Sequence, residues 1–594
     1  MSGRERREGV RRPRIFDAGD PSEVVDPPRV FDATAAVGAV AWVAVGGLVA
    51  VGALRLVGPP TAALAVVLAV AVVVVPMVAR LADLPFRDGT RSRPYRAAAV
   101  LMPVGAAATV VSLALPTGSL AAALAVPWFA TTVLLAVYGV QRGLPNAGRP
   151  AELAVSVGLC YLPVAGVALV LHRLGATVGF TATTMLLTVV HFHYAGGALP
   201  VFAGLLGRES GGRTYRALLV PTLVGPGLVG LGIALSPGPE LLAAGLLAVS
   251  AAGLALYSLL AVPVRDGAGR TLVGLSAVSV TVSMGLVVAY LASRGTGVPL
   301  VTFETMLAGH GWLNAVGFAL LGLTGWRLVD PATSAPPLGL PVSRLTSRGR
   351  VGSDYLDRYG LRADGDAAGM VDRFSAFDGP RCEAAAVHPE VRRFYERTAD
   401  YALHVEPSWS PGLRLGARLY AWLGRRVEQM NFGVHGRAPE PLSSRIVSVD
   451  DAADGRADVR SWVRTYDDTG AAIYVALYAT HRLDGTPYMN IAFPLPWTNL
   501  TSVLSVERLG DGDPGGVELS TGTGGDAGIY LRTQLGPLRL PMDETIRVSA
   551  SGADVGVDAG LEGSDADLYA RHEVRLFGRR FLELDYRMTR LPSA

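Results

Sequence analysis

The feature that most constrains the fold of this chain is a series of long apolar runs between Thr34 and Leu328. Each run is close to the roughly 20 residues that an α-helix needs to cross the hydrocarbon core of a bilayer. We count ten runs, with nine and eleven as alternative counts, at residues 34–57, 61–82, 95–115, 119–140, 151–172, 177–203, 217–236, 240–263, 271–293 and 304–327. These runs predict an α-helical polytopic membrane domain, which agrees with a chain that is 50% hydrophobic.

Arginines in the loops between the runs predict how the chain is oriented. If the N-terminus is cytoplasmic, the segments on that side hold 19 arginines, whereas the opposite side has only Arg55, Arg173 and Arg294 near its helix ends. Cytoplasmic loops of membrane proteins carry such an excess of basic residues. Since an even number of spans returns the chain to its starting side, we expect a multi-pass protein of the cell membrane with both termini in the cytoplasm.

Composition divides the chain into four parts. They are a disordered basic tail (1–33), a multi-span transmembrane domain (34–328), a Pro-rich linker (329–385) and a cytoplasmic β-rich domain with helices at its start (386–594). Residues 331–594 carry 30 arginines against 35 acidic residues, so no nucleic-acid partner is indicated. The only two cysteines, Cys160 and Cys382, lie in different parts and argue against a disulfide framework.

The last part has the pattern of an antiparallel β structure preceded by two helices. Residues 391–403 and 411–430 have helical spacing. Short segments rich in Val, Tyr, Ile and Thr then follow, with Asp-Gly turns among the pieces between them. They lie at residues 459–466, 473–480, 488–492, 500–508, 516–520, 528–534, 545–549, 567–577 and 581–588. The pattern predicts a barrel or curved sandwich, and hence an α+β domain that is mostly antiparallel β.

Two histidines and a tyrosine lie in the middle of the sixth apolar run, where polar groups are costly and tend to mark function. In a regular helix, His191 and His193 point about 200° apart, so they cannot both face one site. Pro200 has no N–H to bond the carbonyl of Gly196, which predicts a kinked or partly unwound segment here. Tyr194 would lie in the same segment.

His310 and Asn314 in the tenth run are four residues apart and share one helix face. If the sixth and tenth spans adjoin, five residues would form one polar cluster: His191, His193, Tyr194, His310 and Asn314. The cluster could be a catalytic site that does acid–base chemistry on a lipid-soluble substrate. Alternatively, three histidines could bind a metal, or the groups could simply form hydrogen bonds between helices. No acidic residue lies beside them in mid-span, so the cofactor, the metal and enzymatic activity stay open.

Several familiar sites are excluded by their missing residues. There is no H-E-x-x-H motif, and the membrane half has too few histidines for a di-iron desaturase-like centre. Residues 522–527 match a loose G-x-G-x-x-A pattern, but a strand follows them where a phosphate site needs a helix. A calcium-loop pattern beginning at Asp450 fails at Ser461, its twelfth position.

Basic and aromatic residues alternate with apolar ones in the β region. They are Arg445, Arg456, Arg460 and Arg464, together with Trp462, Tyr466, Tyr474 and Tyr478. On one face of a sheet they could line a pocket for an anionic or amphipathic ligand, or they could belong to ordinary solvated and core faces.

Three motifs give the chain a family resemblance. They are His191-Phe-His-Tyr-Ala-Gly196, His310-Gly-Trp-Leu-Asn-Ala-Val-Gly-Phe318 and, in the soluble half, Val391-Arg-Arg-Phe-Tyr-Glu-Arg-Thr398. In this order they resemble the YndJ-like membrane protein family. The resemblance covers most of the chain and implies an integral membrane protein, singling out the histidines without naming a substrate.

Three hypotheses about function follow. The first is an intramembrane His/Tyr/Asn site that acts on a lipid-soluble substrate, with the β-rich domain binding or presenting a ligand. The second is a transporter or channel for a small solute, and the third is a membrane-anchored ligand-binding scaffold. The expected partners are the lipid bilayer and a lipid-soluble ligand, and the oligomeric state is left open.

Overall fold

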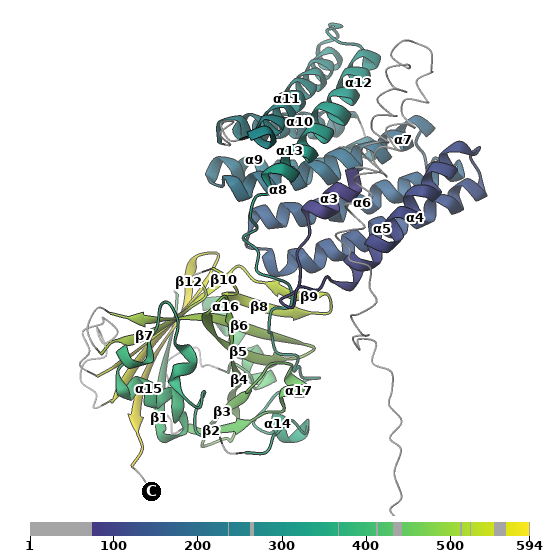
Figure 1. Ribbon diagram of the computed structural model, residues 1–594. Coiled ribbons are helices and arrows are strands. Elements are labelled where there is room, and N and C mark those ends of the chain that lie inside the picture. Colours follow the sequence, from purple (N-terminus) through teal and green to yellow (C-terminus); the bar gives the residue numbers. More distant parts are fainter. Residues whose placement is uncertain are drawn as a thin grey trace, which may run out of the picture.

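In the computed structural model, helices and a strongly curved β sheet form two adjoining parts of the chain (Figure 1). The structure describes residues 74–592 except 236, 262–266, 366, 411–413, 432–441, 511–513, 523 and 552–565. The predicted tail at 1–33, the first predicted span and most of the second lie outside the described residues.

The helical part contains eight helices long and apolar enough to cross a membrane among the residues described. They are α4 (Arg93–Ala114), α5 with η3 (Ser119–Asn146), α6 (Pro150–Leu174), α7-η4-α8 (Ala182–Glu209), α9 (Arg213–Leu235), α10 (Pro237–Ala261), α11 (Gly267–Thr296) and α12-η5-α13 (Phe303–Val329). They confirm the last eight of the ten predicted runs. The second run reaches the described part only as α3 (Val75–Leu81). The described residues therefore hold eight candidate spans, whereas ten were predicted. The difference is the first two predicted runs.

Glycines bring several of these helices into close contact. A Cβ on Gly158 of α6 would lie 2.7 Å from the carbonyl oxygen of Gly197, and one on Gly325 would lie 2.8 Å from the backbone nitrogen of Val273. Small residues at such contacts let helices in lipid approach closely, where van der Waals packing holds them together.

Two of the spans depart from α-helical geometry in the middle. Residues Phe192–Ala198 (η4) and Leu313–Leu320 (η5) are π-helical, and the two segments contact each other. π-Helical turns inside α-helices occur frequently at functional sites. The structure thus has the irregular segment expected after His191, and it brings the two histidine-bearing spans together.

The β part is a single 12-stranded antiparallel sheet. Its strands are β1 (Tyr401–Trp409), β2 (Leu442–Ser448), β3 (Arg460–Tyr466), β4 (Ala472–Leu483), β5 (Thr486–Leu495), β6 (Thr498–Leu509), β7 (Gly516–Ser520), β8 (Gly528–Thr533), β9 (Gly536–Arg539), β10 (Met542–Ala550), β11 (Leu568–Leu576) and β12 (Arg579–Arg590). The main order is β1-β12-β11-β10-β7-β6-β5-β4-β3-β2, and β8 and β9 branch from β6. The end strands β1 and β2 also lie close to each other, without a ladder of hydrogen bonds between their described residues, so the curved sheet forms a barrel with one unpaired seam.

Alternate side chains of the strands point into the barrel or away from it. On β4, Tyr474 and Tyr478 belong to the apolar core inside the barrel, whereas Val475 and Leu477 belong to a second core outside it. This second core is completed by Leu345, Val351, Tyr355, Leu356 and Leu361, which precede the barrel in the chain.

Residues 329–385, interpreted from the sequence as a linker, pack against both parts. Ala335 and Leu338 are buried with the helices, and Phe374 and Phe377 are buried in the core inside the barrel. The segment has little regular structure beyond short turns such as α14 (Tyr355–Arg358) and η6 (Phe374–Phe377). Its proline content predicted the lack of regular elements but not the burial.

The first predicted helix of this domain is shorter than expected. Helix α15 spans Pro389–Glu396, and the residues from Tyr401 onward form β1 instead of continuing the helix to 403. Tyr401 and Leu403 are both buried, in a two-residue alternation that fits a strand. The second predicted helix is α16, Arg414–Val427. All nine predicted strand segments are found, whereas β1, β2 and β9 were not predicted.

Loops of the helical part contact the β domain around Asp526. Its buried carboxylate forms an ion pair with Arg87 and lies 2.7 Å from Nε2 of His481 on β4. Arg149 donates a hydrogen bond to the carbonyl oxygen of Gly525 at 2.6 Å. Burial alone would raise the pKa of Asp526, but His481 and Arg87 hold it below its usual value of 3.8.

Replacing Asp526 with asparagine is expected to loosen this contact. Arg87 would lose its counter-charge, and backbone amides of the contact, such as that of Leu338, which bonds the carbonyl oxygen of Pro85, should exchange about tenfold faster. In the wild type, the contribution of Asp526 is present above pH 3.8 and is lost only as the pH falls through its lower folded pKa. Hydrogen exchange monitored by mass spectrometry checks both points. Asp543→Asn, at an exposed position on β10, is the control. It should change neither the exchange rate of these amides nor its dependence on pH.

Candidate functional site

The structure does not bring the five predicted site residues into one cluster. His193 faces a different helix from His310 and Asn314. His193 is buried with Nδ1 2.7 Å from the carbonyl oxygen of Val189, and its Nε2 accepts a long hydrogen bond, at 3.4 Å, from the indole of Trp128 on α5. His193 therefore faces α5. His191 is the last residue of α7, directly before η4, which contacts η5 of the span that carries His310. The two histidines of the sixth span thus have different neighbours, as a two-residue helical offset requires.

His310 and Asn314 share one hydrogen-bonded group with Ser283 of α11. The Ser283 hydroxyl lies 2.9 Å from Nδ1 of His310, and the Asn314 amide donates to the same hydroxyl at 2.7 Å. The amide also donates to the carbonyl oxygen of His310 at 2.9 Å. This group ties α12 and η5, which form part of the tenth predicted span, to α11.

Two polar atoms of the predicted cluster have no partner among the described residues. They are Nε2 of His191 and the hydroxyl of Tyr194, and both are buried. Buried polar groups usually find a hydrogen bond, so an unpartnered pair calls for an explanation. No three His, Cys, Asp or Glu side chains are grouped to hold a metal ion anywhere in the described part of the chain.

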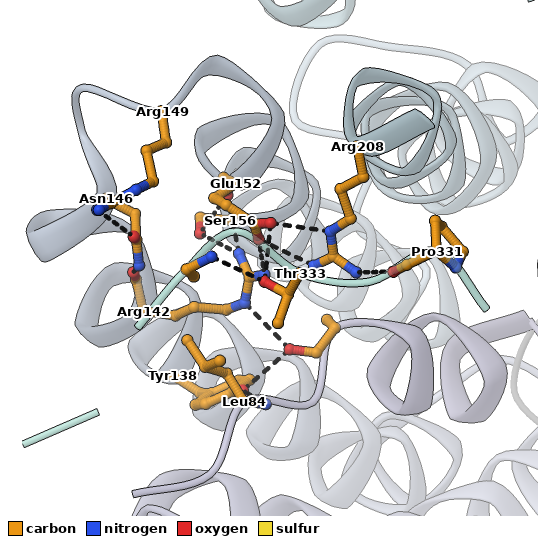
Figure 2. A network of polar contacts seen from close by, with 12 residues as sticks. Leu84, Tyr138, Arg142, Asn146, Arg149, Glu152, Ser156, Arg208, Pro331 and Thr333 are labelled. Atoms are coloured by element: carbon orange, nitrogen blue, oxygen red, sulfur yellow. Dashed lines mark hydrogen bonds and ion pairs between the residues drawn. The ribbon is translucent and has the colours of Figure 1, made fainter. Parts of the chain in front are cut away.

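A second polar group, not singled out from the sequence, lies where α5 and α8 end and α6 begins (Figure 2). Glu152 in the first turn of α6 and Arg142 near the end of α5 are both fully buried and form an ion pair. Arg208 of α8 binds both carboxylate oxygens of Glu152 at 2.8 Å. The hydroxyl of Thr333, just beyond the last span, donates to Glu152 at 2.9 Å.

Arg142 extends this network to backbone carbonyls. Its Nε donates to the carbonyl oxygen of Ala82 at 3.1 Å, and its Nη1 donates to the carbonyl oxygen of Glu152 at 2.8 Å. The same carbonyl of Ala82 accepts from Tyr138 at 3.0 Å. Figure 2 shows these bonds converging from α5, α6, α8 and the segment that leads to the β domain. The network acts as a structural junction between the helices and that segment.

A candidate binding site is the apolar cavity inside the barrel, with a volume of about 210 Å3. An apolar cavity of about 150 Å3 can hold a benzene ring, so this cavity has room for an apolar group somewhat larger than that. The wall is formed by most of the barrel strands together with α15 and α16. Its members include Phe394, Leu403, Tyr420, Trp462, Tyr474, Tyr478, Met489, Ile491, Phe493, Leu519, Ile546, Ala570, Leu584, Tyr586 and Met588.

Three polar side chains lie in this apolar wall. Glu544 on β10 is 2.7 Å from Nε2 of His572 on β11, and Ser502 on β6 donates a hydrogen bond to it. Burial raises the pKa of Glu544, but the neighbouring His572 and the hydrogen bond from Ser502 outweigh burial, so its pKa lies below the usual value. Glu544 is therefore ionised at neutral pH and is already paired.

Arg464 on β3 is fully buried and lies against two aromatic residues of the cavity wall. Its Cζ lies 5.6 Å from the ring centres of both Trp462 and Tyr474. Burial raises the pKa of Tyr586, whose hydroxyl also interacts with the charges of Arg464 and Glu544. The alternation of Trp462, Arg464, Tyr474 and Tyr478 was the sequence signal for this site.

Two comparisons show which known proteins this chain is similar to. A family model described as YndJ-like protein matches residues 64–318. The chain is 28% identical over 516 residues to a Bacillus subtilis (strain 168) protein named "Uncharacterized membrane protein YndJ", covering 84% of this chain and 90% of that protein. No solved structure matches. The predicted resemblance is confirmed, and it extends beyond the membrane-spanning part.

Proposed function

We propose that this membrane protein of the YndJ-like family binds a lipid-soluble molecule inside its β barrel, beside the membrane that its helices cross. The observation that carries the proposal is the barrel cavity, whose wall is almost entirely apolar. Concave, mostly apolar sites with a few polar groups are the usual form of small-molecule sites. The barrel is then a holding site for a molecule that water dissolves poorly.

The position of the barrel supports exchange of this molecule with the membrane. Helix α16 contributes Tyr420 to the cavity wall, while Leu419, Trp422 and Leu423 on the same helix are exposed. Figure 1 draws α16 on the side of the β domain nearest to the helices. Amphipathic helices with exposed Trp and Leu bind at the surface of a bilayer. We propose that α16 meets the bilayer on its cytoplasmic face, in line with the arginine distribution of the loops.

Photocrosslinking tests the proposal directly. The full chain in lipid nanodiscs is exposed to hexadecanol that carries a diazirine near the middle of its chain, and the labelled peptides are identified by mass spectrometry. We expect label on the strands of the cavity wall, for example on β5 at Met489 and Ile491. Label confined to the lipid-facing surfaces of the helices would contradict the proposal.

The unpartnered atoms of His191 and Tyr194 favour a second candidate function. In this alternative, they bind the polar group of a lipid-soluble substrate between α7-η4-α8 and α12-η5-α13. The site then does acid–base chemistry or forms a point on a transport path. Neutral imidazole can both accept and donate a proton, so such a site needs no carboxylate.

Two matched substitutions separate this site from simple helix packing. Ser283→Ala removes two hydrogen bonds between helices and should cost about 1 kcal/mol of stability. Tyr194→Phe removes a hydroxyl that has no partner among the described residues, so stability should stay equal or rise. Thermal unfolding in detergent measures both. If Tyr194→Phe destabilises as much as Ser283→Ala, the hydroxyl has a structural role and the second candidate loses its support.

A further inference from the structure

Arg464 is a buried cation without a counter-charge in the part of the chain that the structure describes. Its Nη2 donates a hydrogen bond to the carbonyl oxygen of Leu403 at 3.3 Å, and the side chain also hydrogen-bonds the hydroxyl of Tyr474. Among the described residues, Nε and Nη1 have no hydrogen-bond partner. The carboxylate of Glu544, which lines the same barrel, is paired with His572 instead. Removing a guanidinium from water without a paired anion is costly, and contacts with aromatic rings offset only part of that cost.

The direction of the Arg464 side chain follows from the strand. Arg464 and Trp462 are two residues apart on β3 and therefore lie on the same face of the sheet. Trp462 lines the cavity, and Tyr474, whose ring lies against the Arg464 guanidinium, lines it as well. The two free donor nitrogens are thus on the inner side of the barrel, beside the apolar cavity.

We infer that the barrel selects an amphiphile with a single anionic head, an oxygen of which accepts a hydrogen bond from Nε or Nη1 of Arg464 while the adjoining part of its chain fills the cavity. Carboxylate and phosphate oxygens both accept strong, charge-assisted hydrogen bonds from a guanidinium. The anion supplies the counter-charge that Arg464 lacks, and the cavity covers the part of the chain next to the head. This inference rests on the proposed function, because it names the class of ligand for the same site.

Competition against the diazirine probe tests the inference on the full chain in nanodiscs. Unlabelled hexadecanoate, hexadecyl phosphate and hexadecanol have the same chain and differ only in the head group. We expect the two anions to displace the probe from the barrel at concentrations at least tenfold lower than hexadecanol does. The order of hexadecanoate and hexadecyl phosphate tells which head group fits better.

Variants of Arg464 test whether this side chain causes the preference for anionic competitors over hexadecanol. Arg464→Met should bring the three competitors within about twofold of one another, and Arg464→Lys should keep part of the preference for anions. Arg445→Met removes an arginine on β2 that is about half exposed, and it should keep the wild-type order.

The outcomes distinguish this inference from the proposal on which it rests. Equal displacement by anions and alcohol in the wild type overturns the selection by Arg464 but leaves apolar binding in the barrel intact. Absence of any label in the barrel overturns both. The selection for anions is decided by the wild type alone, from the ratio of the concentrations at which hexadecanol and the anions displace the probe. The inference is therefore decided even if a variant fails to fold.

Discussion

Replacing Glu152 with glutamine is expected to lower the midpoint of thermal unfolding of the full chain in detergent by roughly 10 °C. The carboxylate is fully buried and compensates two arginines, Arg142 and Arg208. Removing one partner of a buried ion pair typically costs about 3–5 kcal/mol, because a buried charge is left uncompensated. Here two cations would be left, at the junction that also holds Thr333 and the segment toward the barrel.

Two further variants test whether charge compensation is the cause. Glu240→Gln removes a carboxylate of another span whose contact with Arg294 is 3.9 Å long and partly exposed, so the midpoint should shift by no more than a degree or two. Glu152→Gln combined with Arg208→Gln restores the original net charge of the group. This double variant should lose less than the sum of the two single variants. Strict additivity, or an equal loss in Glu240→Gln, would contradict the account of the junction.

Replacing Ala570 with phenylalanine is expected to abolish binding in the barrel while the protein stays folded. Ala570 lines the cavity on β11, so a benzyl group there would occupy the space proposed for the ligand chain. Because the added ring enters an existing cavity instead of a filled core, the usual overpacking cost of about 1–3 kcal/mol should be largely avoided. We expect probe labelling of the barrel to fall at least tenfold, with the unfolding midpoint unchanged or higher.

Ala570→Ser is the matched control, since it alters the same position and adds little volume. It should retain labelling within about twofold of the wild type. If Ala570→Phe binds as well as the wild type and is equally stable, the ligand does not occupy this cavity. If both variants lose binding together with stability, the result reflects damage to the barrel, and Leu519→Phe, at another position of the cavity wall, serves as a second filling variant.

The sequence predicted those features that depend on local periodicity. Apolar runs of membrane-spanning length became the eight described spans, and alternating segments after residue 459 became strands of the barrel. The separation of His191 and His193 also followed from helical geometry. The error at residues 391–403 has the same origin: the helical spacing of α15 was extended into a segment whose burial alternates as a strand.

The features that the sequence did not predict depend on contacts between distant residues. Glu152 binds Arg142, Arg208 and Thr333, which are 10, 56 and 181 residues away. Each of these residues lies at or beyond the end of an apolar run, where a charged group normally faces water or headgroups. Their shared place at one end of neighbouring helices was the available signal. Nothing local shows that the helix ends pack closely enough to bury them.

The most direct test of the central claim is the number and position of apolar molecules bound by the purified chain. Radiolabelled hexadecanoate is titrated into wild-type protein and the Ala570→Phe variant in nanodiscs, with empty nanodiscs subtracted. The account predicts one saturable site per wild-type chain and none in the variant. The same saturable binding in both proteins, or only non-saturable partitioning in both, would contradict it.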